Sequence, residues 1–111
     1  MTGSKEWHKA LVEAEITLFD SSITGRTLAI KTGYRPNHNF GSKENYEMRM
    51  GQITVPNGEW IQPGQTKEVK IEFLFPEGYI IQLEPGLTWR IQEGAKHVAN
   101  GKILRILFSE S

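Results

Sequence analysis

The sequence predicts a small all-β domain that closes into an antiparallel barrel. Short runs alternate apolar and polar residues, and turns containing Gly or Pro separate them at a spacing of roughly ten residues, which is typical of barrels and sandwiches. The 111 residues suffice for one domain with one core, and the chain has no cysteine to form a disulfide. A barrel is favoured over a sandwich because closure hides the edge strands of a small sheet.

The first predicted strand covers residues 12–18, where an apolar residue stands at every second position. A helix is the alternative, because Trp7 and Leu11 extend the same residues as a stripe with helical spacing. The polar residues 37–45 follow later and contain Phe40 as the only apolar anchor, so we expect a solvated surface loop there.

Five further segments complete the predicted sheet. They are residues 48–55, 69–75, 80–83, 89–92 and 102–108. The apolar phase changes at Gly51, which predicts a bulge, and residues 93–96 predict a hairpin turn. Residues 102–108 are apolar on both faces, which predicts a central strand. A second bulge at Asn100 and Gly101 would keep that strand continuous.

Composition excludes several classes of function. The chain has 13 Lys+Arg and 13 Asp+Glu, so no global field attracts a phosphate backbone and we expect no DNA partner. No apolar run approaches the roughly 20 residues of a membrane helix, and residues 1–10 lack a signal-peptide hydrophobic centre. We therefore expect a soluble, cytoplasmic protein with no membrane partner. Its predicted organisation is an N-terminal arm (1–10), one barrel (11–108) and a C-terminal tail (109–111).

Motifs for catalysis are missing from the sequence. No Gly-x-x-x-x-Gly-Lys loop occurs, and no serine lies in a Gly-x-Ser-x-Gly turn. His8, His38 and His97 lie too far apart for a metal pair, and we expect each in a loop or at the surface. Trp60 and Trp89 are predicted to pack in the core. The sequence thus predicts no catalytic residue, cofactor or metal ligand, and a protein that is not an enzyme.

Six short runs together carry a resemblance to a known family. They are Gly25-Arg26, Gly33-Tyr34-Arg35-Pro36, Gly51-Gln52-Ile53, and residues 61–64, 86–91 and 93–101. In order and spacing they resemble the third, C-terminal β-barrel domain of translation elongation factor Tu, over about Leu11 to Leu107. The resemblance implies a six-stranded antiparallel closed barrel, here as a stand-alone domain without GTPase chemistry.

In that family the domain contacts the T-stem backbone of aminoacyl-tRNA and helps to bind the exchange factor. The resemblance and the exposed cations single out six candidate residues for binding RNA or a partner, namely Arg26, Thr27, Arg35, Glu93, Gly94 and Lys96. Glu68 and Gln92 stand where the family carries cations, which predicts weakened tRNA binding. The predicted function is a non-catalytic module that binds a protein partner or a second copy through its barrel surface. Residual binding of the tRNA backbone is the alternative.

Overall fold

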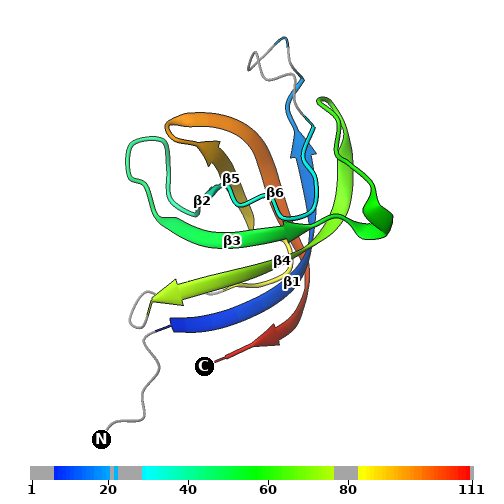
Figure 1. Cartoon of the computed structure of the whole chain (residues 1–111). Helices are drawn as coiled ribbons and strands as arrows, with labels where there is room; N and C mark the ends of the chain where they lie inside the picture. Colours follow the sequence, from blue (N-terminus) through cyan, green and yellow to red (C-terminus); the bar gives the residue numbers. More distant parts are fainter. Residues whose placement is uncertain (1–6, 21, 23–28, 77–82, 111) are drawn as a thin grey trace, which may run out of the picture.

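The strands form a closed antiparallel β-barrel in the computed structural model, which describes residues 7–20, 22, 29–76 and 83–110 (Figure 1). The six strands are β1 (Trp7–Leu18), β2 (Asn37–Asn39), β3 (Met48–Thr54), β4 (Thr66–Pro76), β5 (Thr88–Glu93) and β6 (Lys96–Ser109). Around the barrel they follow the order β1-β4-β3-β2-β5-β6, and every neighbouring pair is antiparallel. The predicted all-β, six-stranded closed barrel is confirmed.

Strand β1 lies between β4 and β6 and supplies much of the core. Val12, Ala14 and Ile16 are fully buried while the intervening glutamates point outward, so the period of two is confirmed and the helical alternative is wrong. The strand begins at Trp7, so residues 7–10 belong to the barrel rather than to the predicted arm. Strand β6 likewise ends at Ser109, one residue inside the predicted tail.

Both predicted bulges are wrong, because the two glycines are needed for close packing instead. Gly51 pairs with Phe73 in regular register, and a Cβ on Gly51 would lie 2.8 Å from Phe73 Cδ1 and 2.9 Å from His38 Nε2. Strand β6 runs through Gly101 in regular register, and a Cβ there would collide with the indole ring of Trp89. The register between β5 and β6 shifts elsewhere, between Ile91 and Gln92.

Three further predictions need correction or lie outside the described residues. Trp60 is 48% exposed, beneath the Lys31 ammonium, instead of packed in the core. Strand β6 is central only in part, because β5 pairs with it no further than Lys102 and Phe108 is left exposed. Of the predicted strand at residues 80–83, residues 80–82 are not described and Leu83 is not in a strand.

The polar residues 37–45 are only in part a surface loop. Their first three residues form β2, which closes the barrel between β3 and β5. His38 and Asn39 are fully buried, so the expectation that His38 lies in a loop or at the surface is wrong. A polar side chain tolerates burial where its hydrogen-bonding atoms have partners, and β2 supplies such positions.

Candidate protein-interaction surface

His38 points into the barrel and holds three strands together. The Trp89 indole Nε1–H donates to His38 Nδ1 over 3.0 Å, and His38 Nε2 lies 3.0 Å from the Gly51 carbonyl oxygen. An indole only donates and a carbonyl only accepts, so the imidazole is neutral with its proton on Nε2. Burial lowers the pKa of His38 to about 4, although the hydrogen bond to Gly51 works in the opposite direction.

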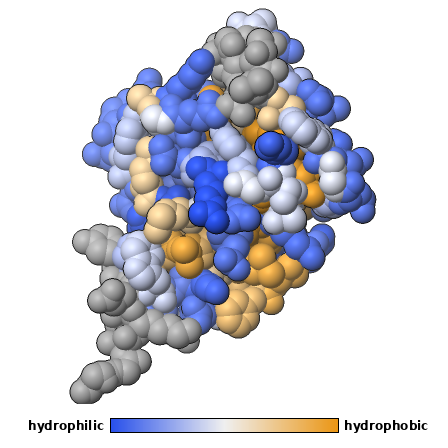
Figure 2. All heavy atoms as spheres, viewed as in Figure 1, coloured by the Kyte–Doolittle hydropathy of each residue, from blue (hydrophilic) through white to orange (hydrophobic). Residues whose placement is uncertain are grey.

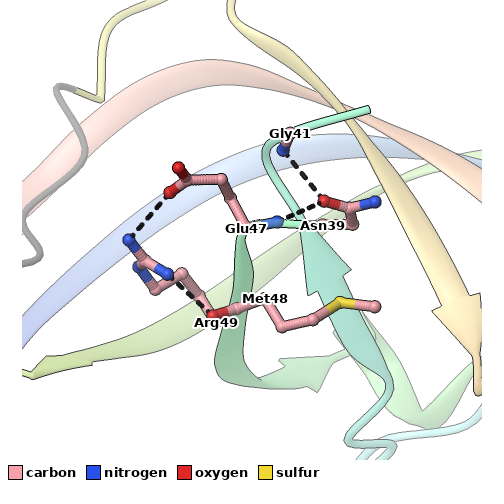
Figure 3. A network of polar contacts seen from close by, with 5 residues as sticks. All are labelled: Asn39, Gly41, Glu47, Met48 and Arg49. Carbon is pink, nitrogen blue, oxygen red and sulfur yellow. Dashed lines mark hydrogen bonds and ion pairs between the residues drawn. The ribbon is translucent and has the colours of Figure 1, made fainter. Parts of the chain in front are cut away.

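Asn39 organises the loop between β2 and β3. Its side-chain Oδ1 accepts hydrogen bonds from the backbone N–H groups of Gly41 and Glu47, both at 2.9 Å (Figure 3). At the start of β3, the Arg49 guanidinium donates to the Met48 carbonyl oxygen over 2.8 Å and reaches the Glu47 carboxylate at 3.3 Å. These contacts fix the loop beside the outer surface of β3.

A groove of about 330 Å³ opens beside this loop on the surface of the barrel. It is lined by Arg35, Pro36, Asn37, Met48, Arg49, Met50, Gly51, Gln52, Glu72 and Leu74. The Arg35 guanidinium is held at one wall, where it donates to Gln52 Oε1 over 3.0 and 2.7 Å. The lining therefore combines thioether and aliphatic groups with two guanidinium groups and one carboxylate.

From the groove, which Met50 and Leu74 line, outward-pointing apolar side chains continue across β3, β4, β1 and β6. Met50 pairs with Leu74, and Leu11 pairs with Phe108, in neighbouring rows of the outer surface. Met50 is 51% exposed and Phe108 is 53% exposed. We call Met50, Leu74, Leu11 and Phe108 together the apolar face. Apolar side chains gather in the lower part of the visible surface, over the region where β1 begins and β4 and β6 end (Figure 2).

The candidate binding residues predicted from the sequence do not gather at one site in the structure. Arg26 and Thr27 lie outside the described residues. Glu93, Gly94 and Lys96 share the predicted hairpin turn, where Glu93 pairs with Lys96 and Gly94 has a φ of +61°. The Tyr34 hydroxyl reaches Glu93 Oε2 over 2.6 Å, whereas the neighbouring Arg35 is directed to Gln52 and the groove.

The two residues that were predicted to weaken tRNA binding, Gln92 and Glu68, each contact other residues of the barrel. Gln92 is fully buried, accepts a hydrogen bond from Asn39 Nδ2 over 2.7 Å and donates to the Gly94 carbonyl oxygen over 3.1 Å. Glu68 lies 3.6 Å from Arg105 Nη2, and Arg105 Nε donates to Glu13 over 2.6 Å. The predicted effect of Glu68 and Gln92 on tRNA binding stays a prediction.

The apolar face was not among the candidate sites expected from the sequence, although one signal for it is present. In β4 the outward positions run Glu68, Lys70, Glu72 and then Leu74, so a leucine interrupts a charged series. Met50 likewise occupies the outward phase of β3. What the sequence does not reveal is the pairing that places these residues next to Leu11 and Phe108.

Two observations concern other kinds of site. Within the described ranges, no three His, Asp or Glu side chains gather in a way that would hold a metal ion. The same ranges include no helix with the length and apolar character needed to span a bilayer. No known protein-family model matches the chain.

Proposed function

We propose that this protein is a non-catalytic interaction module that binds another protein chain through its apolar face and the adjoining groove. The observation that carries the proposal is the exposure of Met50 and Phe108 on one surface, with Leu74 and Leu11 between them. Contiguous exposed apolar side chains with a polar rim are typical of protein-binding surfaces. The arginines of the groove add donors for carboxylates or carbonyl groups of the partner.

The buried polar residues support a non-catalytic role. His38 is engaged at both ring nitrogens by Trp89 and Gly51, and Asn39 and Gln92 hydrogen-bond to each other and to the backbone. A general base or acid needs a free position directed at a substrate. These three side chains instead use their donors and acceptors to hold the fold.

Binding to an RNA backbone has less support. Phosphate contacts depend on accessible cations, and each lost cation weakens binding. Lys96 is exposed, but its strand partner is Glu93, and Arg35 already donates to Gln52. The four residues of the apolar face carry no cation, and Lys9, which lies among them, is accompanied there by the carboxylate of Glu72.

A capture experiment with a matched control tests the proposal. The wild-type chain, Met50→Glu and Thr54→Glu are immobilised and exposed to cell extract with and without nuclease. Thr54 is also exposed in β3 and points outward, but it lies away from the apolar face. We expect nuclease-resistant capture of protein that falls at least about tenfold in Met50→Glu only, because a buried unpaired charge opposes binding. Capture that nuclease abolishes, or that Met50→Glu leaves unchanged, would contradict the proposal.

A further inference from the structure

We infer that the protein bound by the apolar face is a second copy of this chain, related by a two-fold axis that pairs Lys9 of each copy with Glu72 of the other. The inference rests on the proposed function and names its partner. It follows from the positions of Lys9 and Glu72 between the residues of the apolar face and from the zero formal net charge of the chain.

Four outward-pointing residues form the centre of this surface. Lys9 of β1 pairs with Leu74 of β4, and Leu11 of β1 pairs with Glu72 of β4. These residues are therefore the corners of a parallelogram on adjacent strands, where diagonal neighbours are about 7 Å apart. The two leucines occupy one diagonal, and the lysine and the glutamate occupy the other.

Neither central charge has an ion-pair partner among the described residues. Among the other outward charges nearby, Arg105 contacts both Glu13 and Glu68, whereas Lys70 lies two residues from Glu72 on the outer face of β4. The Lys9 ammonium and the Glu72 carboxylate have no such contact in the described ranges of the chain. Covering the apolar face would desolvate both groups, which favours an occupant that presents a carboxylate to Lys9 and a cation to Glu72.

A second copy meets this requirement with a single symmetry operation. In a two-fold interface, residue i contacts residue j of the partner, and residue j contacts residue i. If the two-fold axis lies in the plane of the interface along the diagonal through Leu74 and Leu11, each leucine of one copy contacts the same leucine of the other copy. The same operation brings Lys9 opposite Glu72 twice, and Met50 and Phe108 extend the apolar contact at either end.

The charge of the whole chain agrees with self-association. With 13 basic and 13 acidic residues the formal net charge is zero, so two copies experience no net long-range repulsion. Trp7 and Leu107 are also exposed, at 43% and 44%, and lie near the apolar face at the ends of β1 and β6. They enlarge the apolar area available to a second copy.

Reciprocal charge reversal tests the inference. Sedimentation equilibrium is measured over a concentration series for the wild type, Lys9→Glu, Glu72→Lys and the double variant. We expect a wild-type dimer, dissociation constants raised at least about tenfold in each single variant, and recovery to within about threefold of wild type in the double variant. Lys102→Glu, which reverses an exposed charge on β6 away from the face, should leave the dimer intact. Far-UV circular dichroism confirms that each variant is folded.

Two results would overturn the inference. One is a wild-type chain that is monomeric at about 100 µM, a concentration at which even a weak dimer with a micromolar dissociation constant forms. The other is a double variant that stays as weak as the single variants. A monomeric chain that still captures another protein in a manner sensitive to Met50→Glu would reject the second copy while retaining the proposed function. A monomer that captures nothing would reject both.

Discussion

Acidification should destabilise the barrel through His38. The imidazole has an ordinary pKa of 6.5 in the unfolded chain, and burial lowers this pKa to about 4 in the fold. Between these two values the unfolded state binds more protons, so stability is full above pH 6.5 and falls as the pH decreases. The loss should reach about 2 kcal/mol near pH 5 and level off at about 3 kcal/mol below pH 4.

The structure explains why the proton is unfavourable at this position. A proton on Nδ1 would face the Trp89 Nε1–H donor over 3.0 Å, and the charge would lie beside the rings of Phe73 and Trp89, with no carboxylate contact among the described residues. The exposed carboxyl groups of Glu13 and Asp20 also have lowered pKa values, but their ordinary values are 4.5 and 3.8. Their effect therefore falls below the pH range in which His38 dominates.

Urea unfolding followed by tryptophan fluorescence measures this effect from about pH 7.5 to about pH 5. The control is His38→Gln, which removes the titrating ring. The variant should be less stable than the wild type near pH 7.5, because hydrogen bonds to Trp89 and Gly51 are lost, but its stability should change less with pH. Parallel pH profiles for the two proteins would refute the reasoning.

Three other substitutions have defined outcomes, each measurable by the same unfolding assay. Gly101→Ala should cost about 2 kcal/mol or more, because its Cβ would fall within 3.0 Å of three ring atoms of Trp89, and no loss would mean that the indole can move aside. Asn39→Ala should cost about 2 to 3 kcal/mol, since it removes the acceptor of the Gly41 and Glu47 N–H groups, and a neutral result would show that water replaces it. Trp60→Ala should cost less than about 1 kcal/mol because the ring is 48% exposed, and a larger loss would restore the prediction that it belongs to the core.

The parts of the fold that depend on local alternation were predictable from the sequence. In β1 and β4 a period of two over seven or more residues suffices, because each buried side chain faces the same interior. Strand β2 has no such pattern, since its burial depends on a hydrogen bond that Trp89 donates to His38 and on one that Asn39 donates to Gln92, and both partners are far away in the sequence. Polar burial of this kind depends on tertiary partners that a local pattern does not contain.

The roles of the glycines and the position of the apolar face likewise depend on tertiary partners that a local sequence pattern does not contain. A glycine in a strand indicates either a bulge or close packing, and only the neighbours His38 and Phe73 decide for Gly51. The hairpin that carries Glu93 and Gly94 was predictable, because its turn chemistry is local. The apolar face was not, because it joins residues of four strands whose pairing is non-local.

The three residues of β2 form the narrowest seam of the cylinder. Among the described strands, the backbone pairing that links β3 to β5 runs through Asn37–Asn39. His38 sits in the same segment, so taking up a proton there loosens the one short strand on which closure depends. In mild acid the strand pairing of β2 should therefore be lost first. The amide hydrogens of this segment should then exchange with solvent before those of β1 and β4.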